Sequence, residues 1–219
     1  ALFLKKRPRI YHIVHGYHFN LNSGIKKYIY LIPEKIAAQV SDVVMVMNHE
    51  DYEIAQRYKL YREKLCYIDG IGVDDARFKE ISPEKRIELR RQIGIALNKF
   101  VFAYAAEFSK RKNQSLLIHA FSKCNLENGI LLLAGDGKQK LAAKLGQKES
   151  IRFLGYVKNV PELYMACDAV VSVSLIEGLP FNIVEAMGCG LPVIASDIKG
   201  HRELVEQGKT GVLFESGNE

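Results

Sequence analysis

The stretch AVVSVSLIEGLPFNIVEAMGCGLPVIAS, residues 169–196, decides which fold the sequence predicts. It begins with an apolar run over 169–175 that shows little alternation, which is typical of a parallel strand buried on both faces. A helical pattern over 180–189 separates this run from a second one over 192–196. Strand, helix and strand in this order form the repeating unit of an α/β protein.

The same alternation continues along most of the chain. Apolar runs that predict strands cover residues 9–15, 42–47, 65–69, 100–107, 130–134, 151–154, 169–175, 192–196 and 211–214. Helical patterns between them cover residues 112–124, 138–149, 159–167, 180–189 and 201–208. The sequence therefore predicts an α/β fold, with a parallel sheet that carries helices on both faces.

Residues 70–83 interrupt this alternation with two glycines, two aspartates and a proline, as a linker does. Ser82 is then placed to cap a helix that has Pro83 at its first position. We therefore expect two domains, over residues 1–75 and 76–219. The first has few strands for a parallel domain, and the chain stops just after the last strand of the second. We accordingly expect the first domain to lack its start and the second its closing helix.

The composition excludes several classes of protein. Apolar residues make up 48% of the chain and no apolar run approaches the length of a membrane span, so we expect a soluble protein without a signal peptide. The scattered cysteines predict reduced core thiols in a cytosolic protein: Cys66, Cys124, Cys167 and Cys189. A net charge of +6 favours an anionic partner. No helix-turn-helix, zinc or aromatic-stacking signature supports binding of nucleic acid.

Two carboxylates flank the Gly-Leu-Pro turn of the opening stretch, at Glu177 and Glu185. Open α/β sheets bind ligands beyond the carboxyl ends of their strands, where Glu177 is expected. Because a carboxylate repels phosphate, both glutamates suit sugar hydroxyls better. Either glutamate alone could simply complement the dipole of the helix. The full arrangement of strand, Glu177, Gly-Leu-Pro, helix and Glu185 is a more specific sign of a ligand site.

The turn between the glutamates suits a diphosphate. Gly178 lets the backbone approach a ligand closely. Pro180 fits the first position of the helix, which would leave the N–H groups of Phe181, Asn182 and Ile183 free. Such unpaired groups at a helix N-terminus attract anions.

The chain resembles glycosyltransferase family 4, and the resemblance is strongest over residues 98–214. Its motifs are Glu177-Gly-Leu-Pro-Phe-Asn-Ile-Val-Glu185, Gly190-Leu-Pro-Val-Ile-Ala-Ser, Gly211-Val-Leu-Phe, Lys112-Asn-Gln, Ala134-Gly-Asp-Gly and Phe153-Leu-Gly-Tyr-Val. The stretches VHGYHF (14–19) and NHEDYEIAQRY (48–58) are similar to its capsule and exopolysaccharide transferases. The resemblance implies two Rossmann-like domains that face a cleft, the GT-B fold, and transfer with retention.

The resemblance also implies roles for individual residues. Glu177 would face the donor sugar, Glu185 would bind the donor ribose, and Lys112 would neutralise the diphosphate. The remaining donor-binding residues would be Gly178, Leu179, Pro180, Phe181, Asn182 and, beside the nucleobase, Tyr156 and Val157. Side chains and helix ends stabilise the leaving group in such a site, so we expect neither a metal nor another cofactor. No Asp-x-Asp dyad argues otherwise.

The sequence departs from the family at Glu107, which stands where an arginine often contacts the diphosphate. Lys110 and Arg111 follow at once and would supply the missing charge.

His15 is the second candidate catalytic residue beside Glu177. It is expected at the carboxyl end of a strand, and the family has a histidine at this place near the donor sugar and acceptor. His12 and His18 each lie three residues from His15, a spacing that would suggest metal ligands on a helix, but residues three apart on a strand point to opposite faces. We therefore expect His12 and His18 to be structural or surface residues.

Together these observations predict a hexosyltransferase that uses a nucleotide-sugar, most simply a UDP-sugar, in the synthesis of cell-surface polysaccharide. Its acceptor would be a glycan or a lipid-linked molecule at the cytoplasmic face of the membrane. A helix with Lys26, Lys27 and Lys35 would suit peripheral contact with anionic lipid, and a solvated charged face is the alternative. Two other functions stay open: an inactive nucleotide-sugar-binding fragment, and a nucleotide-sugar epimerase of the GT-B fold.

Overall fold

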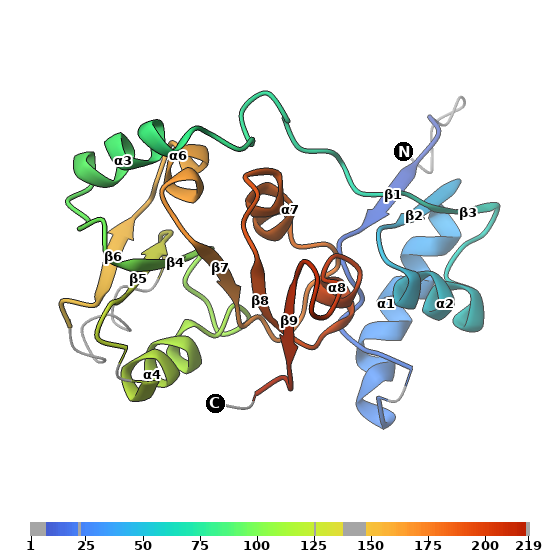
Figure 1. The fold of residues 1–219 in the computed structure, drawn as a ribbon. Helices are drawn as coiled ribbons and strands as arrows, with labels where there is room; N and C mark the ends of the chain where they lie inside the picture. The colour runs from blue at the N-terminus through green and yellow to red at the C-terminus, as the bar shows by residue number, and fades with distance from the viewer. Residues whose placement is uncertain (1–7, 22, 125, 138–147, 218–219) are drawn as a thin grey trace. The chain divides into compact units, whose positions relative to one another are not determined.

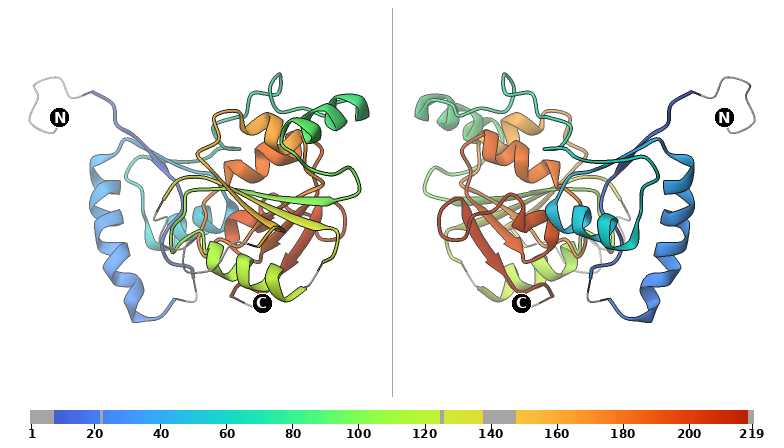
Figure 2. Two further views of the ribbon diagram at one scale, coloured as in Figure 1. Left: turned by 90° about the vertical axis from the view of Figure 1, so that its left-hand side faces the viewer. Right: turned by 90° about the vertical axis from the view of Figure 1, so that its right-hand side faces the viewer.

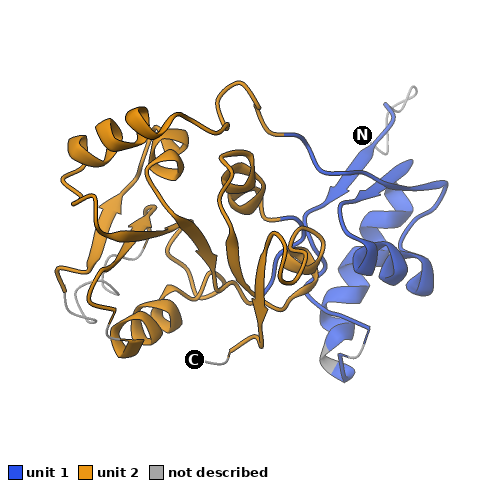
Figure 3. Cartoon of the chain, viewed as in Figure 1, with its two compact units in different colours: residues 1–72, 176–179 blue, residues 73–175, 180–219 orange. Residues whose placement is uncertain are grey.

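The computed structural model describes residues 8–21, 23–124, 126–137 and 148–217 (Figure 1). The chain divides into two compact units (Figure 3). Unit 1 comprises Ala1–Gly72 and Ile176–Leu179, and unit 2 comprises Val73–Leu175 and Pro180–Glu219. The boundary after Gly72 falls inside the irregular stretch 70–83.

Unit 1 is built on a parallel sheet in the order β1-β2-β3. Its strands are β1 Tyr11–Val14, β2 Val43–Val46 and β3 Lys64–Tyr67. Its helices are the short 3-10 helix η1 Ile25–Lys27, α1 Tyr28–Val40 and α2 His49–Tyr58. The core combines Val44 and Val46 of β2 with Leu31 of α1 and Ile54 of α2.

Unit 2 is built on a six-stranded parallel sheet in the order β6-β5-β4-β7-β8-β9. Its strands are β4 Phe100–Ala105, β5 Gly129–Ala134, β6 Ile151–Gly155, β7 Ala169–Ser172, β8 Val193–Ser196 and β9 Gly211–Phe214. The chain runs outward from β4 to β6, returns to β7 beside β4, and then runs outward to β9. This is the strand order of a Rossmann sheet, and its direction reverses between β4 and β7.

Helices cover both faces of this sheet (Figure 2). They are α3 Pro83–Gln92, α4 Gln114–Cys124, α6 Val160–Met165, α7 Phe181–Gly188 and α8 Lys199–Arg202. Side chains alternate along β4, so Val101 and Ala103 join the core that includes residues of α6 and α7, whereas Tyr104 joins the core that includes α4. The two-sided core explains why the strand sequences are apolar runs with little alternation.

The structure confirms the nine predicted strands, each within a few residues of its expected range. The predicted helix start is also confirmed, because Ser82 Oγ accepts a hydrogen bond of 3.3 Å from the Lys85 amide and Pro83 is the first helical residue. The predicted helix over 201–208 was wrong. Helix α8 ends at Arg202, and turns follow it in place of the rest of the predicted helix. In one of these turns, Thr210 Oγ1 accepts a hydrogen bond from the Glu206 amide.

Most of the helix expected over 138–149 lies outside the described residues. The four cysteines are free thiols. Cys167 and Cys189 are buried as expected, but Cys124 is exposed, so the prediction of a core thiol there was wrong. It is the last residue of α4.

Candidate functional site

The loop after β4 holds Lys112 at the carboxyl edge of the sheet in unit 2. The Lys112 carbonyl oxygen accepts a hydrogen bond of 2.9 Å from the Tyr104 hydroxyl, and its amide donates to Ser109 Oγ at 3.3 Å. Gln114, which is buried at the start of α4, donates from Nε2 to the Glu107 carbonyl oxygen at 2.8 Å. The loop that carries Lys112 is therefore fixed at both of its ends.

This loop is joined to the end of β7, the neighbouring strand. The Leu175 amide donates to the Arg111 carbonyl oxygen at 2.9 Å, and Tyr104 Oη lies 2.9 Å from Ser174 Oγ. Strands β4 and β7 flank the reversal of strand order, where open α/β sheets bind their ligands. The structure thus brings the loop of Lys112 and the end of β7 to one point.

Helix α7 begins one residue later than predicted. Pro180 has an extended backbone, with φ −79° and ψ 102°, and is the residue before the helix instead of its first residue. The Ile183 amide donates to the Pro180 carbonyl oxygen at 3.0 Å, so the expectation that this N–H is free was wrong. A tight first turn uses that donor, because helix ends satisfy part of their unpaired groups with bonds three residues apart.

One polar group at the start of α7 is buried without a partner. Within the described parts of the chain, no hydrogen-bond acceptor lies in reach of Asn182 Nδ2. Buried donors are nearly always paired in proteins, and an exception asks for an explanation such as a ligand. Asn182 is thus a donor at the place where the sequence predicts a diphosphate.

Glu185 lies in the second turn of α7 and is half-buried. Desolvation by burial raises the pKa of its carboxyl group above the ordinary value, and the charge of Arg77 partly offsets this effect. Tyr164 is fully buried near it, and its desolvation, with a contribution from the Glu185 charge, raises the pKa of its phenol. A partly desolvated carboxylate is a strong acceptor for hydroxyl groups.

The loops after β4, β5 and β6 are also connected. The Ala106 amide donates to the Ala134 carbonyl oxygen at 2.9 Å, and the Gly135 amide donates to the Gly155 carbonyl oxygen at 2.7 Å. Gly135 has φ +144°, and a Cβ there would lie 2.0 Å from the Ala106 oxygen, so only glycine fits. The motifs around residues 106, 135 and 155 therefore share one edge of the sheet.

The other predicted donor residues of unit 2 differ in exposure. Tyr156, after β6, is 73% exposed, as an aromatic ring that stacks on a base would be. Val157 is half-buried and packs against the core of unit 2. Glu107, Lys110 and Arg111 are exposed around the Lys112 loop.

The segment with Glu177 and the turn with His15 lie together in unit 1. A Cβ on Gly178 would lie 2.3 Å from the His15 carbonyl oxygen, and a Cβ on Gly16 would lie 2.8 Å from the Gly178 nitrogen. Two glycines are therefore required where these backbones meet. Glu177 is 7% exposed, whereas His15, directly after β1, is exposed. Leu179, a predicted donor-binding residue, is buried. The structure therefore brings His15 and Glu177, the two predicted catalytic residues, into neighbouring segments.

Asn48 and Asp51 hold this arrangement, and the sequence analysis missed both. Asn48 Oδ1 caps α2 by accepting from the Asp51 amide at 2.7 Å. Asn48 Nδ2 donates to Asp51 Oδ2 at 2.6 Å and to the Gly178 carbonyl oxygen at 2.9 Å. Asp51 Oδ1 accepts from the Tyr17 amide at 3.3 Å, and the Asn48 and Asp51 side chains are fully buried. The Asn-x-x-Asp spacing, which resembles a capping box, was the signal that could have found them.

The two histidines set aside by the sequence analysis lie on either side of His15. His12 is half-buried on β1. His18 is exposed, and its ring stacks on that of Tyr30 with 5.5 Å between centroids.

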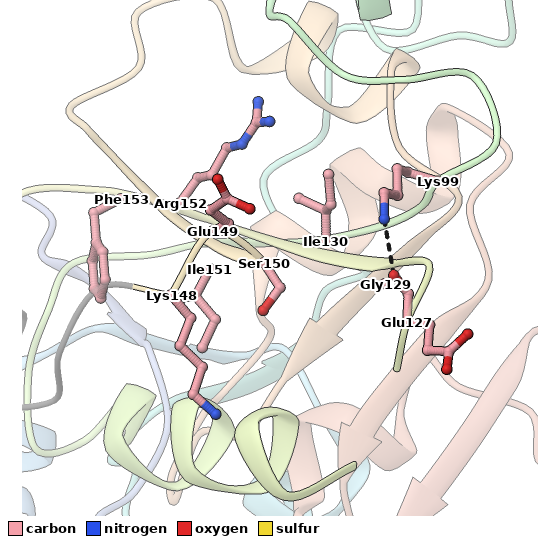
Figure 4. A pocket seen from close by; sticks show the side chains of 10 residues that line it. All are labelled: Lys99, Glu127, Gly129, Ile130, Lys148, Glu149, Ser150, Ile151, Arg152 and Phe153. Atoms are coloured by element: carbon pink, nitrogen blue, oxygen red, sulfur yellow. Dashed lines mark hydrogen bonds between the residues drawn. The ribbon is translucent and has the colours of Figure 1, made fainter. Parts of the chain in front are cut away.

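A hollow of about 840 Å³ lies elsewhere in unit 2, where β4, β5 and β6 begin (Figure 4). Its lining includes Lys99, whose Nζ donates to the Glu127 carbonyl oxygen at 2.8 Å, and Arg152. Because ligands of open α/β sheets bind at the opposite, carboxyl edge, we do not assign the site to this hollow.

Across the described residues, no three His, Cys, Asp or Glu side chains are grouped as ligands of one metal ion. None of the helices there combines the length and apolar character that crossing a bilayer requires.

Comparisons with known sequences agree with these motifs. Residues 85–219 match the family described as Glycosyl transferases group 1. EpsD of Bacillus subtilis, which carries a glycosyltransferase name, is 33% identical over 218 residues, covering 96% of this chain and 57% of EpsD. An Escherichia coli enzyme, UDP-Gal:alpha-D-GlcNAc-diphosphoundecaprenol alpha-1,3-galactosyltransferase, is 29% identical, covering 95% and 56%. The chain thus spans a little over half the length of these relatives.

Solved structures show the same architecture. HepE of Anabaena in complex with UDP-glucose is 27% identical with a TM-score of 0.77, covering 95% of this chain and 59% of HepE. A sucrose-phosphate synthase of Thermosynechococcus elongatus is 21% identical with a TM-score of 0.80, covering 98% and 56%. The prediction of Rossmann-like α/β domains of the GT-B type is confirmed.

Proposed function

The chain belongs to the family of group 1 glycosyl transferases, and we propose that it forms the donor site and part of the acceptor side of a retaining hexosyltransferase. The donor is a UDP-sugar, and the acceptor is a glycan or a lipid-linked glycan of the cell surface. Residues 76–219 bind the donor and residues 1–75 contribute to the acceptor side. The names of the Escherichia coli relative and of the HepE complex support this choice, since both contain a uridine-diphosphate sugar.

The hydrogen bond between the Leu175 amide and the Arg111 carbonyl oxygen is the observation that carries this proposal. It joins the loop of Lys112 to the end of β7 at the reversal of strand order. A diphosphate bound at this point would meet the Lys112 ammonium on one side and the start of α7 on the other. Both are positive, the second because of the helix dipole, so both stabilise the charge that develops as the glycosidic bond breaks.

The nucleoside is proposed to extend from the diphosphate toward Glu185 and Tyr156. Glu185 accepts from the ribose hydroxyls, and its partial burial strengthens those bonds. Lys110 and Arg111 offset the charge of Glu107, which stands where the family often has an arginine.

Glu177 and His15 are proposed to act at the donor sugar. The close contact of Gly178 with the His15 backbone keeps their segments together. A buried carboxylate and an exposed imidazole in adjacent segments suit recognition of sugar hydroxyls on one side and approach of an acceptor on the other.

The protein is proposed to act at the cytoplasmic face of the membrane. Helix α1 presents Ile29 and Ile32, which are 70% and 58% exposed, together with Lys35. Such a surface suits peripheral contact with anionic lipid. Lys27 precedes α1, and its Nζ donates to Tyr58 Oη at 2.9 Å.

A panel of UDP-, GDP- and ADP-sugars, read out by thermal shift, tests donor binding. A ligand that binds only the native state adds about 2.7 kcal/mol of stability at a hundredfold excess over Kd. We expect only the uridine-diphosphate sugars to raise Tm. Stabilisation by ADP- or GDP-sugars alone would contradict the proposed donor.

Release of UDP in the presence of a lipid-linked glycan then separates the functional classes. Transfer to the acceptor supports a transferase. Binding without UDP release at any acceptor concentration identifies a binding fragment, and conversion of the UDP-sugar to its epimer identifies an epimerase.

A further inference from the structure

A chain of buried polar groups crosses the carboxyl edge of the sheet in unit 2. It begins at His201 of α8, which is fully buried. His201 Nε2 lies 3.0 Å from Ser172 Oγ, and Nδ1 lies 2.6 Å from the Ser196 carbonyl oxygen. Ser196 Oγ donates in turn to the Ser174 carbonyl oxygen at 2.6 Å. The chain therefore runs from α8 across β8 to the end of β7.

Tyr104 carries this chain to the Lys112 loop. Its hydroxyl is 2.9 Å from Ser174 Oγ and 2.9 Å from the Lys112 carbonyl oxygen. The carbonyl oxygen can only accept, so Tyr104 donates its single proton there, and the Ser174 hydroxyl donates to Tyr104. One phenol thus ties the loop after β4 to the end of β7 across the reversal of strand order.

The ring of Tyr104 is fixed before its hydroxyl meets the loop. The residue is 1% exposed and packs in the core formed with Leu117 and Phe121 of α4. The residue after Lys112 is Asn113, which adopts φ +54°, a left-handed conformation that asparagine takes more readily than other non-glycine residues. An anchored carbonyl at Lys112 therefore defines where the lysine side chain starts.

We infer that Tyr104 is a positioning residue for the diphosphate subsite, because its hydroxyl holds the backbone of Lys112 against β7. This inference rests on the proposed donor site. Tyr104 itself touches neither donor nor acceptor in this proposal and acts through Lys112. The ligand class it serves is a nucleoside diphosphate, and it should contribute nothing to binding of the nucleoside alone.

Tyr104→Phe tests the inference, with Tyr164→Phe as the matched control. Both tyrosines are fully buried in unit 2, but the Tyr164 hydroxyl has no hydrogen-bond partner in the part of the chain that the structure describes. Calorimetric titration with uridine and with UDP gives the ratio of their affinities for each variant. We expect Tyr104→Phe to weaken UDP by roughly three- to tenfold, the equivalent of one lost hydrogen bond, without weakening uridine. Tyr164→Phe should leave the ratio unchanged.

Hydrogen exchange of the Leu175 amide gives a second readout that needs no ligand. This amide donates to the Arg111 carbonyl oxygen, so loosening of the loop should speed its exchange in Tyr104→Phe and not in Tyr164→Phe. Circular dichroism of both variants confirms that the fold is kept.

The outcomes separate this inference from the proposed function. A wild-type protein that binds no UDP overturns the donor site, while faster exchange at Leu175 in Tyr104→Phe would still support the anchor. A wild-type protein that binds UDP, with Tyr104→Phe unchanged or with uridine weakened as much as UDP, overturns the positioning role alone. Unchanged exchange at Leu175 also overturns it.

Discussion

The side-chain amide of Asn48 donates a hydrogen bond of 2.9 Å to the carbonyl oxygen of Gly178, a residue 130 positions further along the chain. The same Asn48 caps α2 and binds the buried carboxylate of Asp51. The segment that carries Glu177 is therefore held by a side chain whose own position is fixed by a helix start.

Asn48→Ala should lower the free energy of unfolding by about 2–4 kcal/mol. Loss of the cap accounts for about 0.5–2 kcal/mol, and loss of the Asn48 donor to the buried Asp51 carboxylate accounts for about 1–3 kcal/mol. Urea denaturation followed by circular dichroism measures the change. Asn20→Ala is the control, because Asn20 is exposed and its change should stay within about 0.5 kcal/mol. Equal stabilities of the two variants would show that the Asn48 contacts contribute little.

Gly178→Ala should disrupt the meeting of the Glu177 and His15 segments. The added Cβ would lie 2.3 Å from the His15 carbonyl oxygen, so the backbones must separate, at a cost of about 1–3 kcal/mol. Gly24→Ala provides a control in the same unit, because a Cβ there meets no atom within 4 Å. We expect sugar transfer to fall strongly in the first variant and to stay unchanged in the second. Full transfer by Gly178→Ala would contradict the close contact.

The strands, and the place of Lys112 and Glu185 beyond the carboxyl ends of strands, were predictable because they depend on local signals. Buried parallel strands must be apolar on both faces, and Lys112 and Glu185 each follow a strand at the same edge of one sheet. The tight turn that engages the Ile183 amide was not predictable, because the same residues could form either an ordinary or a tight first turn of the helix. The Asn-x-x-Asp spacing could have identified Asn48 as a helix cap, but its contact with Gly178, a residue distant in sequence, follows no spacing rule.

Lys112→Ala should weaken UDP and UDP-sugars alike and hardly affect uridine. Lys112 is half-buried, so the expected cost is about 2 kcal/mol, at the low end for a charge pair removed from water. Lys99→Ala is the control, because Lys99 precedes the same strand, β4, at the opposite edge of the sheet. Calorimetric titration measures the affinities. If uridine lost as much affinity as UDP in Lys112→Ala, the diphosphate role of Lys112 would have to be dropped.

Donor binding should not depend on a divalent metal. The reason is the proposed use of Lys112 and the start of α7 to neutralise the diphosphate, together with the lack of an Asp-x-Asp dyad in the sequence. Titration of UDP before and after treatment with EDTA checks this expectation. An affinity that collapses with EDTA and returns with manganese would overturn it.

Glu185→Gln should weaken the donor and yet stabilise the protein without ligand. The pKa of Glu185 is raised in the folded state by desolvation, so the native protein binds this proton more tightly than the unfolded chain does. Ionised Glu185 therefore costs stability at neutral pH, and this cost disappears as pH falls through the raised pKa toward the ordinary value of 4.5. Glutamine carries no charge and avoids the cost.

The variant should accordingly have the higher Tm at neutral pH, by a margin that shrinks steadily as the buffer is taken down to about pH 4. With uridine bound, the wild type should have the higher Tm. The ribose hydroxyls meet a carboxylate in the wild type and a weaker acceptor in the variant, which lowers the binding free energy of uridine by about 1–2 kcal/mol. Thermal unfolding at several pH values, with and without uridine, measures both effects. A Tm margin that stayed constant with pH would contradict the desolvated carboxylate. A variant that gained as much from uridine as the wild type would remove Glu185 from the ribose subsite.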